Sequence, residues 1–251
     1  MFRFLLCLVS VQLLGLSASA QLKRGFEQTI AAQATIEDLV RQPDLWMMEV
    51  EFKQMRMVYL DVRDPKTGEM RKEHVWYLAY RFLNRPLASR PNEDSLPVNG
   101  LDPLPGPRMF EPKFTLITYD NPSTEIPKFI LQDEIVPDAL PQIRAIERAN
   151  VLDSVGLYRE LPAIVPADAE DQPWIYGVAT WRNVDPETDF FKVIATGFSN
   201  GYKLELPDDQ KSAWRQCIVQ KFKRPGDEFD PNRREFLFDG KPGWTMLPDS
   251  K

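Results

Sequence analysis

Residues that bind metals or form covalent cross-links are scarce in this sequence. The 251 residues include one histidine, His74, and two cysteines, Cys7 and Cys217. A single histidine excludes a two-histidine zinc site, and Cys7 lies in an N-terminal segment that we expect to be removed. Cys217 then has no partner for an intramolecular disulfide, so we predict a buried thiol, no metal site and a core stabilised by apolar packing.

Motifs that hold nucleotide cofactors, or that activate a serine through a neighbouring lysine, are also missing. The sequence contains no glycine-rich phosphate loop, no G-x-G-x-x-G pattern and no S-x-x-K pattern. The formal net charge of −6 is a modest acidic excess, which argues against nucleic acid as the main partner. We therefore predict no cofactor and no nucleic-acid partner.

Long hydrophobic runs are absent after residue 20, but residues 1–20 have the pattern of a secretory signal peptide. Arg3 precedes an apolar run that is too short to span a bilayer, and the segment ends in Ala18-Ser19-Ala20. We predict cleavage after Ala20 and no transmembrane segment thereafter. The mature protein is expected to be secreted or periplasmic.

Residues 21–45 form a polar segment, with a short helix predicted after Thr35 as its N-cap. A β-rich half, residues 46–164, begins with apolar residues at alternate positions from Trp46 to Phe52. That alternation breaks near residues 54–56, which predicts a bulge, and residues 64–68 are expected to form a turn. Residues 74–83 are apolar on both faces, which predicts a central strand paired with the strand before it.

The remainder of the first half contains a proline-rich segment, two more strands and a helix. Seven prolines between residues 86 and 113 predict a long irregular loop. Strands are expected at residues 114–119 and 128–136. Apolar residues at three-residue spacing predict a helix near residues 138–149, with Asp138 as its cap.

The second β-rich half covers residues 174–248 and follows a polar connector at residues 165–173, which is the place for a domain boundary if the halves are separate domains. Asn200-Gly201 between two strand-like runs predicts a hairpin. Strands are expected at residues 174–182, 190–198, 202–206, 213–223 and 235–238. We predict a mainly β fold, an immunoglobulin-like β-sandwich of one large or two small units with one short inserted helix.

One motif suggests catalysis. Residues 197–201 match the G-x-S-x-G nucleophile elbow of α/β hydrolases, with Ser199 as the nucleophile. An elbow needs a strand that runs into a helix and a histidine later in the chain, whereas here a strand pattern follows and His74 lies far upstream. A pair of carboxylates acting as a glycosidase stays open, since the 37 acidic residues make chance pairs common. We predict no catalytic residue.

Two tryptophans are candidates for ligand binding, because an exposed aromatic ring can stack on a sugar. Trp174 follows Pro173, and Trp244 follows Pro242-Gly243, so both are expected to be more exposed than the other four tryptophans. The alternative for each is packing in the core, which is common for tryptophan.

Four segments of the sequence resemble an uncharacterised family of signal-peptide-bearing bacterial proteins of unknown function. The resemblance lies in residues 75–81, 177–186, 197–202 and 222–229. It implies a secreted or periplasmic protein and transfers no catalytic residues.

Together these observations predict a non-enzymatic protein that binds an envelope protein or a surface polymer such as a polysaccharide. Two alternatives remain: a secreted hydrolase that uses acidic residues or Ser199, and a structural component of an envelope or coat.

Overall fold

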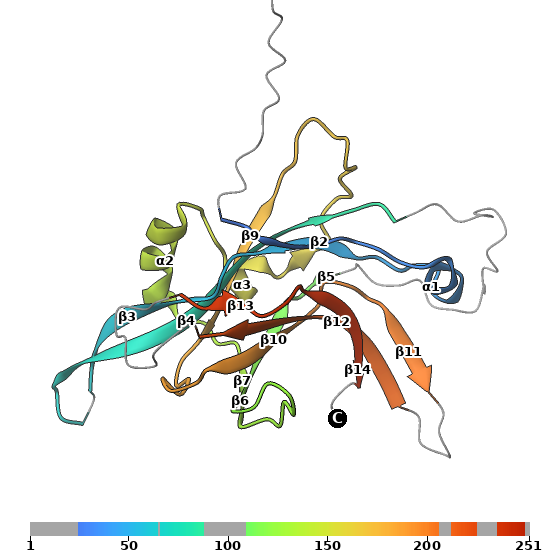
Figure 1. The fold of residues 1–251 in the computed structure, drawn as a ribbon. Helices are drawn as coiled ribbons and strands as arrows, with labels where there is room; N and C mark the ends of the chain where they lie inside the picture. The colour runs from blue at the N-terminus through green and yellow to red at the C-terminus, as the bar shows by residue number, and fades with distance from the viewer. Residues whose placement is uncertain (1–24, 65, 88–108, 206–211, 225–234, 249–251) are drawn as a thin grey trace, which may run out of the picture.

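The structure, a computed structural model, describes residues 25–64, 66–87, 109–205, 212–224 and 235–248. It is mainly β, as predicted, with two antiparallel sheets that lie face to face and the helix α2 (Leu140–Glu147) on the outer side of the first sheet (Figure 1). The predicted signal peptide, residues 1–20, and residues 88–108 of the predicted proline-rich loop lie outside the described residues.

The first sheet is built around one long strand. Strands β2 and β3 lie end to end along one edge of β4, while β9 pairs with the other edge and β1 pairs with β2. The bounds are β1 (Gln28–Ile30), β2 (Met48–Phe52), β3 (Arg56–Arg63), β4 (Met70–Asn84) and β9 (Ile175–Trp181). The central strand predicted at residues 74–83 is confirmed.

The local features predicted around this strand are also confirmed. Phe52 pairs with Tyr80 and Arg56 with Tyr77, so the three residues 53–55 lie opposite only two, as in a bulge. In the turn before β4, Asp64 Oδ1 accepts hydrogen bonds from the backbone N–H groups of Lys66 (2.7 Å) and Thr67 (3.2 Å).

The second sheet has β12 at its centre. Strands β10 and β11 pair with one edge of β12, and β13 and β14 pair with the other, while β6 and β7 continue the sheet beyond β10. The bounds are β6 (Lys113–Tyr119), β7 (Phe129–Gln132), β10 (Phe190–Thr196), β11 (Tyr202–Glu205), β12 (Ser212–Lys223), β13 (Leu237–Phe238) and β14 (Gly243–Pro248). A separate small pair joins β5 (Met109–Phe110) to β8 (Arg159–Glu160).

The hairpin predicted at Asn200-Gly201 is wrong. Strands β10 and β11 do not pair with each other, because both pair with the same edge of β12. The segment between them bends toward the first sheet, where the backbone N–H of Met48 donates to the carbonyl oxygen of Phe198 (2.8 Å). Residues 197–201 therefore form an irregular bend inside one long edge.

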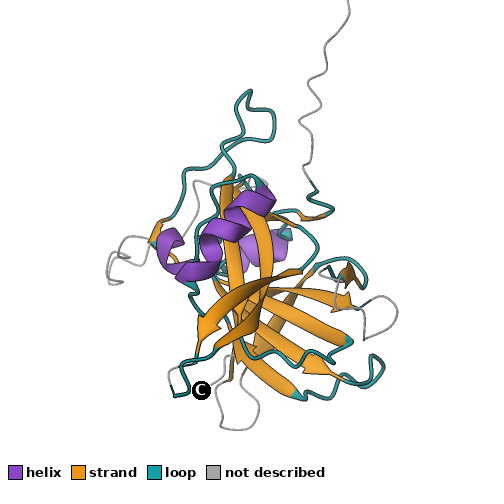
Figure 2. Ribbon diagram, turned by 90° about the vertical axis from the view of Figure 1, so that its left-hand side faces the viewer, coloured by secondary structure: helices purple, strands orange, loops and turns teal. Residues whose placement is uncertain are grey.

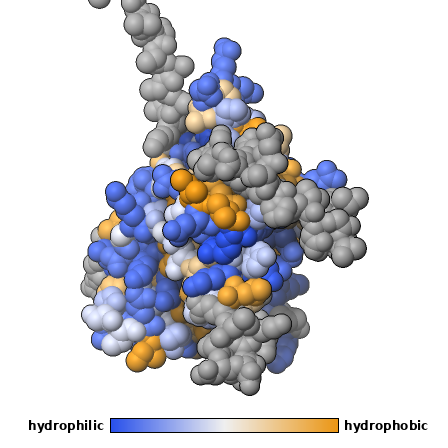
Figure 3. All heavy atoms as spheres, turned by 90° about the vertical axis from the view of Figure 1, so that its right-hand side faces the viewer, coloured by the Kyte–Doolittle hydropathy of each residue, from blue (hydrophilic) through white to orange (hydrophobic). Residues whose placement is uncertain are grey.

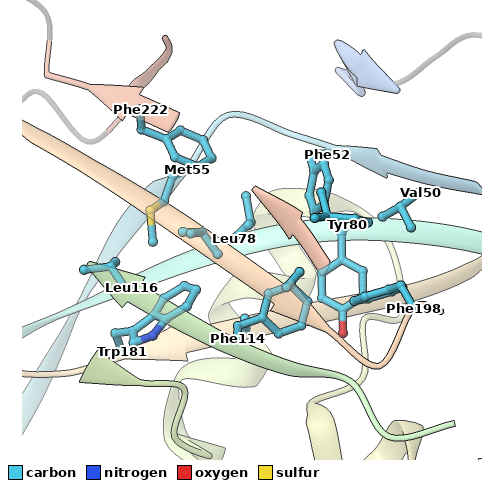
Figure 4. Close-up of a cluster of buried hydrophobic side chains, with 14 of the residues drawn as sticks. Val50, Phe52, Met55, Leu78, Tyr80, Phe114, Leu116, Trp181, Phe198 and Phe222 are labelled. Carbon is cyan, nitrogen blue, oxygen red and sulfur yellow. The ribbon is translucent and has the colours of Figure 1, made fainter. Parts of the chain in front are cut away.

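A core of aromatic side chains fills the space between the sheets. Tyr80 from β4 faces Phe114 from β6, and Phe198 packs edge-on against both rings (Figure 4). Phe82 from β4 also packs edge-on against Phe198. Burial of this apolar surface is the main source of stability in a chain whose described cysteine, Cys217, forms no disulfide.

The described residues form three α-helices. The longest of them, α2, covers the outer face of the first sheet (Figure 2). The bounds are α1 (Ile36–Arg41), α2 (Leu140–Glu147) and α3 (Ser154–Leu157). The Thr35 cap of α1 is confirmed, since its side chain accepts from the N–H of Asp38. The Asp138 cap of α2 is wrong, because Asp138 lies within a 3-10 turn, Pro137–Ala139, that leads directly into the helix.

Each sheet takes strands from both sides of the connector at residues 165–173. Strand β9 follows the connector but pairs with β4, and β6 precedes it but pairs with β10. The two sheets also share one apolar cluster.

Candidate functional site

A groove of about 940 Å³ lies on the outer face of the second sheet. This face points away from the first sheet, and none of the described helices covers it (Figures 1 and 2). Side chains from six strands of the sheet contribute to its walls, and residues 199–202 form one end. A concave surface of this size is within the usual range for ligand-binding sites.

The apolar floor of the groove follows from the two-residue period of the strands. Phe114 and Leu116 of β6 point into the inter-sheet core, so Ile117 points outward. By the same alternation Val193 is buried in the core while Ile194 faces the groove. Ile130 of β7 adjoins Ile117 as its direct cross-strand partner and is 61% exposed. The floor is therefore a row of isoleucines on the outer face of the sheet, of which Ile130 is the most exposed and Ile117, at 9%, is nearly buried.

Amide and hydroxyl side chains contribute to the walls, together with the charged side chains of Glu111, Lys113 and Arg215. Gln132 Oε1 accepts a hydrogen bond from the hydroxyl of Thr115 (3.0 Å) on one side. On the other side, the hydroxyl of Ser199 donates to Gln216 Oε1 (2.8 Å). The remaining donors and acceptors of these groups are available to a ligand that presents hydroxyl groups.

The bend at residues 197–201 is held rigidly beside the groove. Asn200 Oδ1 accepts from the backbone N–H of Trp46 (2.7 Å), and its Nδ2 donates to the carbonyl oxygen of Asp44 (3.0 Å). Gly197 has φ +83°, and a Cβ there would lie 2.1 Å from the carbonyl oxygen of Glu111. The two flanking glycines of the sequence motif therefore have a packing role, since a Cβ at Gly201 would lie 2.2 Å from Gln216 Oε1.

Ser199 lacks the surroundings of a nucleophile. The strand predicted after it is confirmed as β11, whereas an elbow requires a helix. His74 lies on β4 of the other sheet, with its ring 6.3 Å from that of Tyr59. The acceptor for the Ser199 hydroxyl is the amide oxygen of Gln216, which is too weakly basic to take its proton.

The groove also lacks a pair of carboxylates. Among the described residues that line it, Glu111 carries the single carboxylate, and it forms an ion pair with Lys113 (2.9 Å). Glycosidases need two carboxyl groups about 5 to 9.5 Å apart. The lining of this groove gives no support to that chemistry.

Cys217 lies in the floor of the groove, yet its side chain is nearly inaccessible. The residue is 1% exposed, which confirms the predicted buried thiol. Burial raises the pKa of Cys217 to about 11, so the reactive thiolate is suppressed at neutral pH.

Trp174 and Trp244, the predicted binding residues, lie in two different environments outside the groove lining. Trp174 is half-buried, with its ring 4.2 Å from the guanidinium of Arg81. Trp244 on β14 packs against the inter-sheet core, and its Nε1 donates to the carbonyl oxygen of Ala31 (2.9 Å). The structure does not bring the two rings together at one surface.

A buried ionic cluster on the opposite side of the molecule fastens α2 to the first sheet. The Glu147 carboxylate accepts hydrogen bonds from Lys53 Nζ (2.6 Å), Arg56 (2.9 Å) and the hydroxyl of Tyr77 (2.8 Å). Burial alone would raise the pKa of Glu147, but the hydrogen bonds from Lys53 and Tyr77 and both cationic charges hold it below its ordinary value. All donors are satisfied within the fold, so the cluster serves stability.

Sequence reasoning missed the groove residues. The available signal was an apolar residue at the outward position of three successive strands, Ile117, Ile130 and Ile194, where an exposed sheet face usually carries polar residues. This pattern can be recognised only when it is known which face of each strand points into the core.

Comparison of the chain with protein-family models, with curated proteins and with solved structures gives no match. Within the described residues, no helix has the length and apolar character to cross a membrane. The same residues contain no group of three or more histidine, cysteine, aspartate or glutamate side chains placed to hold a metal ion.

Proposed function

We propose that this protein is exported and binds an extended surface polysaccharide in the groove of the second sheet, without catalysing a reaction. The observation that carries the proposal is the lining of the groove, where an isoleucine floor lies between amide and hydroxyl side chains. Sugars present apolar C–H faces and hydroxyl edges, so this combination matches both kinds of surface.

An exposed aromatic side chain supports a sugar ligand. Tyr202 lines one end of the groove and is 49% exposed. Its ring can stack on the C–H face of a sugar, and the ring itself is rigid. Trp46 lines the same end but also packs against the inter-sheet core, so Tyr202 is the more accessible ring.

The end of the molecule that adjoins the groove at β11 gives little support to a broad protein interface. The end of the molecule that carries α1 and β11 shows separate apolar patches among hydrophilic side chains (Figure 3). The exposed large hydrophobic residues on these elements are Ile36, Val40, Tyr202 and Leu204. Isolated apolar residues are normal on a protein surface, whereas a stable protein interface usually has a larger contiguous patch.

A glycan array followed by calorimetric titration tests the proposal. Tyr202→Ala and Gln132→Ala are expected to weaken binding of the array hits several-fold each, because one stacking contact, or one hydrogen bond from an amide, contributes about 1 kcal/mol. Tyr158→Ala is the matched control, since Tyr158 is 56% exposed and lies outside the groove lining. The proposal fails if no glycan binds, or if the groove variants and the control bind equally well.

Export has its own test. Mass spectrometry of the protein recovered from the periplasm or the medium is expected to show Gln21 as the first residue. An intact N-terminus in the cytoplasmic fraction would overturn this part of the proposal. The immunoglobulin-like relationship of the two sheets also stays a proposal, to be tested against an experimental strand order.

A further inference from the structure

Two lysines face each other on the outer surface of the second sheet. Lys192 of β10 and Lys221 of β12 are direct cross-strand partners, so their side chains lie on the same face. Like charges in such a pair repel each other, and Lys192 is only 21% exposed, which limits solvent screening. The pair therefore requires an anion between the two ammonium groups.

Glu125 supplies that anion from a loop outside the sheet. Its carboxylate accepts hydrogen bonds from Lys192 Nζ (2.7 Å) and from Lys221 Nζ. These two hydrogen bonds lower the pKa of Glu125, so its carboxylate remains ionised. Glu125 belongs to the loop that joins β6 to β7.

The loop holds Glu125 in a backbone conformation that disfavours it. Its φ of +48° lies in the left-handed region, which is costly for a residue with a Cβ. Partly exposed ion pairs contribute little net stability. Exchange of Glu125 for the carboxylate of a ligand keeps both lysines paired and releases this backbone strain. Backbone strain of this kind is concentrated at active sites, ligand clamps and switch regions.

The lysine pair continues the floor of the groove. Lys192 is the cross-strand partner of Ile117, which lines the groove, and it lies two residues before Ile194 on the same face of β10. Lys192 and Lys221 lie one and two strand spacings beyond Ile117, about 5 and 10 Å, so an extended ligand along the isoleucine row can reach both.

We propose that Lys192 and Lys221 form an anion subsite that binds the carboxylate of an acidic sugar in the polysaccharide and that Glu125 occupies this subsite when no ligand is bound. The inference rests on the proposed function, and it narrows the ligand to an acidic polymer. Binding exchanges one carboxylate for another, so the lysines stay paired throughout. Glu125 acts as an internal competitor.

The test uses the full protein and a panel of acidic oligosaccharides, each paired with its methyl ester, which keeps the sugar and removes the charge. At least tenfold tighter binding of the free acids is expected, and this preference should fall as salt screens the charges. Lys192→Gln and Lys221→Gln should abolish the preference. Glu125→Gln should strengthen binding of the acids, because it removes the competing carboxylate, whereas a purely structural Glu125 would give weaker binding.

Lys223→Gln is the matched control, because Lys223 lies on the same strand but pairs with Asp239 (3.2 Å). A sulfated oligosaccharide distinguishes a general anion site from one that prefers carboxylates. The anion subsite would be overturned if acids and esters bound equally well while Tyr202→Ala still weakened the binding of both. The proposed function would then remain intact. Failure of every glycan to bind would overturn the proposed function itself.

Discussion

Gly177 on β9 tests how tightly the aromatic core is packed. It is the direct cross-strand partner of Tyr80, whose ring covers the position where a side chain would stand. A Cβ at Gly177 would lie 2.3 Å from Tyr80 Cζ and 2.6 Å from its Oη. These contacts are far inside van der Waals distance, so Gly177→Ala requires the ring or the strand to move.

The ring has little room to move, because Tyr80 is fully buried and packs against Phe114 (ring centroids 4.8 Å apart) and Phe198 (5.6 Å). Overpacking of a core costs about 1–3 kcal/mol, and the depth of this clash places Gly177→Ala near about 3 kcal/mol. For a chain of this size each kcal/mol shifts the melting temperature by roughly 2–4 °C, so a drop of about 6–12 °C is expected.

Thermal unfolding followed by circular dichroism measures the effect. Gly243→Ala on β14 is the matched control, since no atom lies within 4 Å of the Cβ it would carry. Tyr80→Leu removes the obstructing ring, so Gly177→Ala should cost much less in that background than in the wild type. Melting temperatures for Gly177→Ala and Gly243→Ala that agree within error would refute the packing described for Tyr80.

Three other predictions concern buried groups. Tyr80→Phe should leave stability unchanged or raise it by up to about 1 kcal/mol in urea unfolding, because the Tyr80 hydroxyl is buried without a hydrogen-bond partner among the described residues. Glu147 has its pKa held below its ordinary value of 4.5, so its contribution is present above that pH and lost as the pH falls; Glu147→Gln should flatten the decline in stability between about pH 5 and pH 3. Cys217, whose pKa burial raises to about 11, should resist alkylation at pH 8 until the protein is unfolded in denaturant, and rapid labelling of the native protein would contradict this burial.

Features set by neighbouring residues were predictable from the sequence. The apolar run of β4, the extra residue between β2 and β3, the turn at Asp64 and the Thr35 cap each depend on a short stretch of chain. Their physical causes are side-chain alternation and local hydrogen bonds, which a single sequence displays directly.

Features set by distant partners were not predictable in this way. The Asn-Gly signal at residues 200–201 is local, but β12 pairs with both β10 and β11 and so prevents the hairpin. Strand β14 was missed, because its six residues begin with Gly243 and end with Pro248, and β12 provides its pairing. Trp244 was expected to be exposed beside Pro242-Gly243, yet β14 directs its ring toward the core.

Prediction of the groove from the sequence would have required knowing how the two sheets pack against each other. Which face of β6 and β10 points outward is decided by the first sheet, which covers the other face. Until the outward face is known, the sequence does not distinguish Ile117 and Ile194 from core residues of a strand. Gln132 and Gln216, which lie on opposite sides of the groove, likewise come from two strands that are distant in the sequence.

The pairing of strands from both sides of the connector affects the order in which this chain can fold. Strand β4 has no partner on one edge until β9 has been made, and β6 waits for β10 in the same way. Long-range pairing of this kind slows folding. Neither sheet can be completed until the last third of the chain has been made, so a partly synthesised chain exposes unpaired edges of β4 and β6 to other chains.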